Sequence, residues 1–293
     1  MSGSGADHHS PKQILAQRSL RPRRRFGQNF LVDERFATRI ANAIPDAAYA
    51  IEIGGGTGTL TGALAERCRF LKVLEVDRDL VAVMRERFAG ADNVSVHDGD
   101  ALEFDYRADL QSQPSPRAIC GNLPYYITTP LLERIVASSD VWEAAVIMVQ
   151  REYAQRLSAV PGTANYGSLA LFTAHHCAVE KLFDIGAAGM YPAPTVASAV
   201  VRLRPRPDRL AKLRNEALLL WLIRAAFAQR RKMLVNSVAS QVPHTRPVAR
   251  AALQEILARL KINADTRAER LSLDDYIQIA NALDEAGFVV PPR

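Results

Sequence analysis

The chain of 293 residues contains little cysteine and no long apolar run. Its three cysteines, Cys68, Cys120 and Cys177, are odd in number and widely spaced, which argues against a disulfide framework and against a zinc site. No apolar stretch approaches the roughly 18 residues of a membrane span, and the first 20 residues lack the apolar block of a signal peptide. The adjacent His175 and His176 also lack metal-ligand spacing. We therefore expect a cytoplasmic protein with no membrane association and no metal.

The remaining composition is that of a globular protein, with 48% hydrophobic and 23% charged residues. These fractions exclude a wholly disordered or fibrous chain. At roughly 150 residues per domain, the length predicts two domains, or one large domain with an appendage.

The net charge of +6 is concentrated in two segments. Residues 1–25 carry a net +5 and residues 217–254 a net +6, so the rest of the chain is acidic, with a net −5. Basic segments on an acidic body favour a polyanionic partner, because each neutralised phosphate releases condensed counterions. Two solvated basic stretches are the alternative that charge alone leaves open.

Strand-like and helix-like segments alternate in the first two thirds of the chain. The expected strands are residues 49–53, 70–76, 93–96, 118–120, 144–149 and 197–203. The alternation predicts a mostly parallel sheet with right-handed crossovers. After Arg204-Pro-Arg-Pro207 the apolar spacing is close to 3.6 over residues 217–238, 247–260 and 272–286, which predicts helices. We expect a flexible basic N-terminal tail (residues 1–22), a Rossmann-like α/β domain (23–204) and a smaller all-helical domain (205–293).

A glycine-rich loop, Glu52-Ile-Gly-Gly-Gly-Thr-Gly58, lies between the first expected strand and a helix. Glycine at Gly54 and Gly56 allows a ligand to approach the backbone closely. Glu75 follows Gly54 by 21 positions, at the end of the second strand, where an acid can bind ribose hydroxyls. The pair predicts a nucleoside-cofactor site that suits NAD and S-adenosylmethionine equally well. An ordinary strand-helix turn is the alternative.

Two further polar features follow later strands. Asp100 is positioned either to accept a hydrogen bond from an adenine amino group or to cap the next element. Asn122-Leu-Pro-Tyr125 follows the fourth strand, and the Asn122 side-chain oxygen with a nearby main-chain carbonyl can accept both hydrogens of an adenine amino group. These acceptors favour a more tetrahedral, nucleophilic nitrogen, while Tyr125 stacks on the base. The loop therefore indicates methyl transfer to adenine rather than hydride transfer; a purely structural loop is the alternative.

Together these motifs resemble those of the small-subunit (16S) ribosomal RNA adenine N6,N6-dimethyltransferases of the KsgA type. The resemblance runs from about residue 22 to about residue 290 and includes Arg25-Phe-Gly-Gln-Asn-Phe-Leu31, Tyr191-Pro-Ala-Pro-Thr-Val196 and Ala226-Phe-Ala-Gln-Arg-Arg-Lys232. It implies a Rossmann-like S-adenosyl-L-methionine-dependent methyltransferase domain followed by a helical RNA-binding domain. It also implies dimethylation of two adjacent adenosines in the 3′-terminal hairpin loop of small-subunit rRNA, during late subunit assembly.

The resemblance implies a role for each matching position. The expected cofactor-binding residues are Asn29, Leu31, Gly54, Gly56, Glu75, Asp100 and Asn122. The expected catalytic loop is Asn122, Leu123, Pro124 and Tyr125, and the target base is expected to pack on Tyr125, Met190 and Tyr191. The expected RNA contacts are Arg23, Arg24 and Arg25, with Arg230, Arg231 and Lys232 on a C-terminal helix. The implied partners are small-subunit rRNA and the immature small ribosomal subunit. We also expect a monomer, since no heptad or exposed apolar stripe demands a dimer.

Four residues of this chain depart from the usual family pattern. Tyr126 occupies a position where Asn is common, Tyr153 one where an aliphatic residue is usual, Met190 one where Phe is common, and Thr195 one where Lys is common. Met190 supplies a thioether and no aromatic face, so base packing would depend more on Tyr125 or Tyr191. Two alternatives stay open. One is an assembly factor whose main role is to bind the immature subunit, and the other is a large-subunit rRNA methyltransferase of the macrolide-resistance type.

Overall fold

The computed structural model describes residues 10–242 and 246–290, except for the side chains of Arg24, Arg209, Leu210 and residues 246–248. Its contacts divide the chain into two compact units. Unit 1 is Met1–Ala154 with Glu180–Pro205, and unit 2 is Gln155–Val179 with Arg206–Arg293. The second segment of unit 2 begins at Arg206, next to the domain boundary expected at residue 205. Unit 2 also contains residues 155–179, which were expected to belong to the α/β domain.

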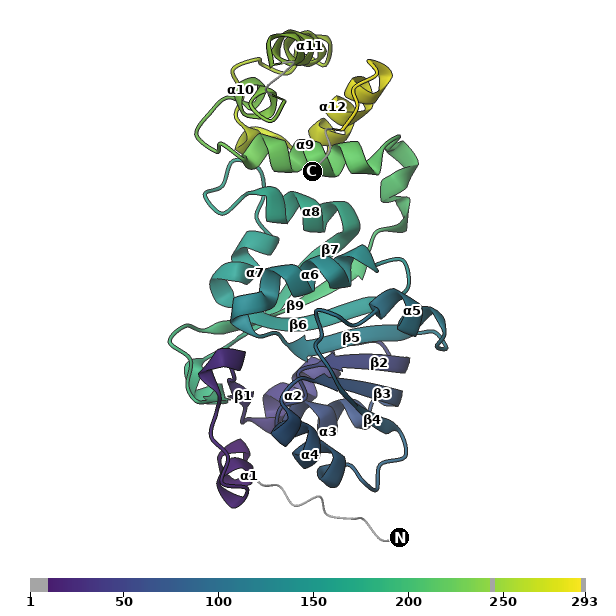
Figure 1. Ribbon diagram of the computed structural model, residues 1–293, viewed down its shortest axis with the longest axis vertical. Coiled ribbons are helices and arrows are strands. Elements are labelled where there is room, and N and C mark those ends of the chain that lie inside the picture. The colour runs from purple at the N-terminus through teal and green to yellow at the C-terminus, as the bar shows by residue number, and fades with distance from the viewer. Residues whose placement is uncertain (1–9, 243–245, 291–293) are drawn as a thin grey trace. The chain divides into compact units, whose positions relative to one another are not determined.

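Unit 1 is built on a seven-stranded sheet in the order β4-β3-β2-β5-β6-β9-β7 (Figure 1). The strands are β2 (Ala47–Ile53), β3 (Cys68–Glu75), β4 (Val94–Asp98), β5 (Arg117–Asn122), β6 (Ala144–Gln150), β7 (Cys177–Ile185) and β9 (Ser198–Pro205). β4, β3, β2, β5 and β6 are parallel to one another, whereas β9 runs antiparallel to β6. The predicted mostly parallel, Rossmann-like sheet is therefore confirmed.

The central strands are continuous apolar runs because both faces of a parallel sheet are covered. Ile51, Ile119 and Val146 are fully buried in neighbouring strands. The helices of this unit are α2 (Glu34–Ala41), α3 (Thr59–Ala65), α4 (Arg78–Arg87), α5 (Tyr106–Gln111) and α6 (Thr128–Ala137), and α7 (Arg151–Leu157) crosses the unit boundary. Since the strands alternate with helices, the parallel strands direct their carboxyl ends to one edge, where ligands bind in such folds.

The segment of residues 11–31, called the N-terminal segment below, packs against the rest of unit 1. It contains α1 (Pro11–Gln17), η1 (Arg24–Phe26) and β1 (Phe30–Leu31). A capping box between Ser10 and Gln13 starts α1, and Ile14 and Leu15 are buried. Within residues 1–22, expected to be a flexible tail, residues 11–17 instead form a helix with a buried face, and residues 1–9 lie outside the described residues.

β1 forms a separate two-stranded sheet with β8 (Met190–Tyr191), which follows η3 (Ala187–Gly189). The strands are antiparallel, with Phe30 opposite Tyr191 and Leu31 opposite Met190. This pairing fixes the end of the N-terminal segment to a stretch about 160 positions further along the chain.

Unit 2 is helical around one hydrophobic core that includes Leu222, Leu257 and Tyr276. It contains α8 (Ser168–His176), η4 (Pro207–Lys212), α9 (Glu216–Phe227), α10 (Leu234–Ala239), α11 (Arg246–Arg259), η6 (Ala268–Arg270) and α12 (Leu273–Glu285). None of the described helices is long and apolar enough to cross a membrane.

The helix expected over residues 217–238 is interrupted after Phe227. The Ser237 hydroxyl accepts a hydrogen bond from the Gln229 backbone N–H at 3.1 Å and donates one to the Ala225 carbonyl at 2.8 Å. A side chain therefore satisfies backbone groups that a continuous helix would pair internally. The basic residues 230–232 consequently lie in the turn between α9 and α10, not on a helix as expected.

Candidate active site

A cavity lies in unit 1 at the carboxyl ends of β2, β3 and β5, with about 1140 Å³ of empty space that is partly open to solvent. Its lining includes all seven residues expected to bind the cofactor, Asn29, Leu31, Gly54, Gly56, Glu75, Asp100 and Asn122. The other three residues of the expected catalytic loop, Leu123, Pro124 and Tyr125, also line it. The structure thus brings together segments that lie up to about 95 positions apart.

The glycine-rich loop is held open by its backbone conformation. Gly54 and Gly56 have φ values of +77° and +57°, in the left-handed region that side chains rarely adopt. A Cβ atom on Gly56 would also lie 3.0 Å from the Phe30 ring. A larger residue at Gly56 would therefore strain the loop and crowd the wall that Phe30 forms.

Glu75 fixes this loop to the end of β3. Its Oε2 atom accepts a hydrogen bond from the Gly56 backbone N–H at 2.9 Å, and its Oε1 atom accepts from Val76 and Asp77 at 3.0 and 2.9 Å. Burial raises the pKa of this carboxyl group despite the three donors. Each carboxylate oxygen has two acceptor sites, so Oε2 retains one that can receive a ligand hydroxyl.

Glu52 is a cavity-lining residue to which the sequence analysis assigned no role. Its carboxyl group is 1% exposed, and its Oε2 atom accepts a hydrogen bond from the Thr61 hydroxyl at 2.6 Å. Its Oε1 atom has no hydrogen-bond partner among the described residues. Burial, reinforced by the charge of Glu75, raises the pKa of Glu52 to about 8. A buried acceptor without a partner is costly, so this atom points to a ligand donor.

Asp100 lies at the exposed rim of the cavity, after β4. Its Oδ1 atom accepts a hydrogen bond from the Leu102 backbone N–H at 2.8 Å. This bond is the capping role that the sequence left as the alternative. The second carboxylate oxygen is still compatible with the expected contact to an adenine amino group.

Asn122 is the last residue of β5 and connects the loop to the N-terminal segment. Its Nδ2 atom donates a hydrogen bond to the Asn29 carbonyl at 2.7 Å, which leaves Oδ1 as the acceptor that this side chain can offer to a ligand. Leu123 anchors the loop, since it is 1% exposed and its N–H donates to the Met148 carbonyl at 3.0 Å. Pro124 then leads into the short helix η2 (Tyr125–Ile127).

The expected base-packing residues are only partly brought together. Tyr125 lines the cavity, and its hydroxyl lies 2.7 Å from Ser198 Oγ and 4.0 Å from Met190 Sδ. Met190 is 4% exposed and Tyr191 packs on the cluster of Leu15, Phe30 and Leu80, and neither lines the described cavity. Met190 and Tyr191 form β8, which pairs with β1, so both residues pack against the N-terminal segment. This pairing was not predicted from the sequence.

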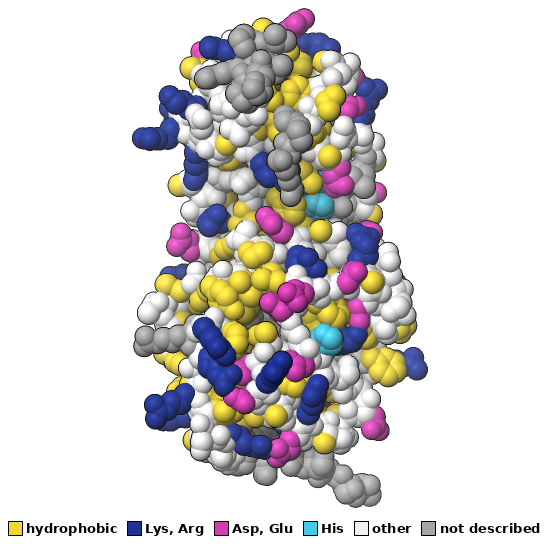
Figure 2. All heavy atoms as spheres, viewed as in Figure 1, with side chains coloured by type: hydrophobic (Ala, Val, Ile, Leu, Met, Phe, Trp, Pro, Cys, Tyr) yellow, Lys and Arg dark blue, Asp and Glu magenta, His cyan; other side chains and the backbone are white. Residues whose placement is uncertain are grey.

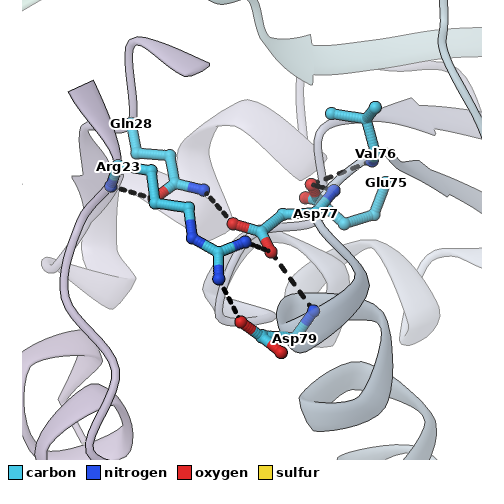
Figure 3. A network of polar contacts seen from close by, with 6 residues as sticks. All are labelled: Arg23, Gln28, Glu75, Val76, Asp77 and Asp79. Carbon is cyan, nitrogen blue, oxygen red and sulfur yellow. Dashed lines mark hydrogen bonds and ion pairs between the residues drawn. The ribbon is translucent and has the colours of Figure 1, made fainter. Parts of the chain in front are cut away.

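Arg23, expected to contact RNA, is engaged in a network within the chain (Figure 3). Its guanidinium group forms ion pairs with Asp77, at 2.5 Å, and with Asp79. Gln28 joins them, because its Nε2 atom donates to Asp77 at 2.9 Å and its Oε1 atom accepts from the Arg23 backbone N–H at 2.7 Å. Two carboxylates compensate this guanidinium charge, so Arg23 holds the N-terminal segment against the start of α4.

Arg24 and Arg25, the other two arginines of the run Arg23–Arg25, differ from Arg23. Arg25 is exposed, with its guanidinium carbon 4.6 Å from the centre of the Phe26 ring. The side chain of Arg24 lies outside the described residues. Figure 2 shows Lys and Arg side chains interspersed with Asp and Glu on the face in view. Of the described side chains of Arg23 and Arg25, Arg25 is the more exposed and the better placed to contact a phosphate.

The second basic run is also divided. The Arg230 guanidinium donates to the carbonyls of Ala164 and Tyr166, at 2.6 and 2.8 Å, and so holds a loop of unit 2. Arg231 and Lys232 are exposed in the turn between α9 and α10. These two side chains are better placed than Arg230 to contact a phosphate backbone.

The sheet, with its antiparallel β9 beside β6, and the cavity at its carboxyl edge define a Rossmann-like methyltransferase fold. The family model described as ribosomal RNA adenine dimethylase matches residues 19–285. The chain belongs to this family of enzymes.

Curated relatives named ribosomal RNA small subunit methyltransferase A match most of the chain. The protein of Chromohalobacter salexigens is 36% identical over 94% of this chain and 98% of the relative, and that of Methylococcus capsulatus is 39% identical over 90% and 98%. Among solved structures, a dimethyladenosine transferase from Plasmodium falciparum has a TM-score of 0.76 at 24% identity, covering 88% of this chain and 98% of that one. The 23S rRNA methyltransferase ErmE has a TM-score of 0.64 at 24% identity, covering 87% and 99%. These two likenesses support the fold.

Proposed function

We propose that this protein transfers methyl groups from S-adenosylmethionine to the N6 amino groups of two adjacent adenosines in the 3′-terminal hairpin loop of small-subunit rRNA. The observation that carries this proposal is the single cavity shared by the glycine-rich loop, Glu75, Asp100 and the loop of Asn122. The names of the curated relatives support the small subunit as the source of the RNA. We place the reaction in late small-subunit assembly, in the cytoplasm.

The cavity residues fit such a cofactor. Glu75 Oε2 would accept a ribose hydroxyl, and Asp100 at the rim would accept from the adenine amino group. Glu52 Oε1, buried and without a partner among the described residues, would accept from an ammonium group, whose positive charge would favour loss of the proton that burial retains on this carboxyl group. Gly54 and Gly56 would let the cofactor pass close to the backbone, opposite Asn29 and Leu31. When bound, S-adenosylmethionine supplies an electrophilic methyl group on its sulfonium centre.

Asn122 would orient the adenine amino group for attack. Its Oδ1 atom and the carbonyl of Leu123 would accept the two amino hydrogens, which makes the nitrogen lone pair available to the methyl group. The bond to the Asn29 carbonyl holds the Asn122 side chain in advance, so little reorganisation is needed during the reaction. Because the acceptors act by position and charge, a strong general base is not required.

The target base must leave its stack or lie in a loop to enter this cavity. Tyr125 would pack on the base, with its ring held by the contact to Ser198. Arg25, Arg231 and Lys232 are exposed and would bind phosphates. Arg23 and Arg230, although Arg230 is itself 49% exposed, are engaged within the chain and would act indirectly by ordering the N-terminal segment and a unit 2 loop.

The test is methyl transfer from labelled S-adenosylmethionine to immature small subunits that lack the modification, followed by nuclease digestion and mass analysis. We expect dimethyladenosine at two adjacent positions with the natural chain, and strongly reduced transfer with Asn122→Ala. In a parallel reaction that contains large subunits, label in their RNA together with none in the small subunits would indicate an enzyme of the macrolide-resistance type. Absence of transfer, with the cofactor and the subunits both shown to bind, would indicate an assembly factor and overturn the proposal.

A further inference from the structure

Tyr126 is an exposed aromatic residue on the lining of the cavity. Its side chain is 57% exposed, although it directly follows the half-buried Tyr125. A Cβ atom on Gly27 would lie 3.1 and 3.4 Å from two carbons of the Tyr126 ring, so the backbone of Gly27 supports this ring. Gly27 has a φ of +59°, which disfavours a side chain at that contact. The ring is thus supported by the N-terminal segment and still accessible to a ligand.

Tyr125 and Tyr126 serve the cavity in different directions. They are consecutive in the 3₁₀ helix η2, in which successive side chains are about 120° apart. The Tyr125 hydroxyl is held by Ser198 inside the unit, whereas Tyr126 lies at the solvent-exposed rim. Since Asn122 lines the cavity and Tyr126 is at its exposed rim, a base at Asn122 would leave the adjacent nucleotide near Tyr126.

We infer that Tyr126 stacks on the base of the nucleotide adjacent to the target adenosine; this inference rests on the proposed function. Aromatic side chains at the edge of a binding cavity bind unstacked bases through their rings, with little dependence on base identity. If the two targets are adjacent, the neighbour of one target is the other. Tyr126 therefore holds the second adenosine at the mouth of the cavity while the first one is methylated.

Three substitutions separate stacking from simple packing. With immature small subunits as substrate, Tyr126→Phe keeps the ring and leaves KM unchanged. Tyr126→Leu and Tyr126→Ala remove the ring and raise KM by about tenfold, with a smaller effect on kcat. Binding of S-adenosylhomocysteine, measured by calorimetry, stays the same in all three. Phe70→Ala is the matched control, since Phe70 is 45% exposed and lies outside the described cavity lining.

A second substrate tests which base is contacted. Small subunits are reconstituted with a synthetic 3′ RNA segment in which one target adenosine is kept and the adjacent one is abasic. We expect the KM of the natural chain to be about tenfold higher on this substrate than on intact subunits. Tyr126→Ala should not raise the KM for the abasic substrate any further. A tenfold effect of Tyr126→Ala that persists on the abasic substrate would overturn the inference, as would full activity of Tyr126→Leu. Failure of the natural chain to methylate intact subunits would instead refute the proposed function.

Discussion

The buried carboxyl group of Glu52 should make the stability of unit 1 depend on pH. Its pKa is raised to about 8 in the folded chain from an ordinary value of 4.5, mainly by burial. Between these pH values the folded chain retains a proton that the unfolded chain has released. The free energy of unfolding therefore decreases as the pH rises from 4.5 to 8, because the folded state binds more protons.

The size of this effect follows from proton linkage. One retained proton gives a slope of about 1.4 kcal/mol per pH unit in the middle of this window. For a unit of this size, 1 kcal/mol corresponds to roughly 3 °C in Tm, so the contribution of Glu52 is roughly 4 °C per pH unit. Glu52→Gln is neutral at every pH. In the natural chain the Thr61 hydroxyl donates a hydrogen bond of 2.6 Å to Glu52, and the amide oxygen of the variant can still accept this bond.

The assay is thermal unfolding followed by circular dichroism at pH 5.5, 6.5 and 7.5. We expect Glu52→Gln to gain stability relative to the natural chain with each step in pH. Glu66→Gln, a change of an exposed glutamate at the end of α3, is the control and should give a curve parallel to that of the natural chain. Parallel curves for Glu52→Gln and the natural chain would show that Glu52 is ionised in the folded protein and would refute the reasoning.

Three other variants test the site and its supports. Asn122→Ala should lower kcat by roughly 100-fold while cofactor binding persists, because one amino-group acceptor is lost; unchanged turnover in the methyl-transfer assay would contradict this role. Replacing Arg231 and Lys232 together by Ala should weaken subunit binding and reduce the slope of log K against log salt by about 2, measured by filter binding at several salt concentrations. A slope equal to that of the natural chain would place the RNA contact elsewhere. Asp77→Asn should cost about 1–3 kcal/mol by removing a buried ion-pair partner, and faster trypsin cleavage after residues 23–25 would report it. An unchanged cleavage rate would show that the network of Figure 3 does not hold the N-terminal segment.

Much of the sheet and the cavity was predictable because the relevant signals are local. Continuous apolar runs identified the strands. The positions of Glu75 and Asn122 at the ends of strands, and of Asp100 shortly after one, placed these residues at one edge of the sheet. The glycine-rich loop was equally visible, since positive φ values at Gly54 and Gly56 require a residue without a side chain. These residues all line the cavity, as the alternation of strands and helices implies.

The features that were not predicted depend on contacts between distant residues. The pairing of Met190 with Leu31 buries a side chain that motif comparison placed beside the target base. Arg23, which was expected to contact RNA, instead forms ion pairs with Asp77 and Asp79 at the start of α4. The break after Phe227 depends on the Ser237 hydroxyl, ten positions away, although the apolar periodicity continues through it.

The pairing of β1 with β8 also has a consequence for synthesis on the ribosome. Residues 30–31 leave the exit tunnel long before residues 190–191, yet they are neighbours in the finished protein. Contacts with such large sequence separation form late, because closing the intervening loop costs entropy before any contact forms. We therefore expect the first half of the sheet to assemble on the nascent chain while the wall supplied by the N-terminal segment stays open. The cavity is completed only when nearly two thirds of the chain has been made.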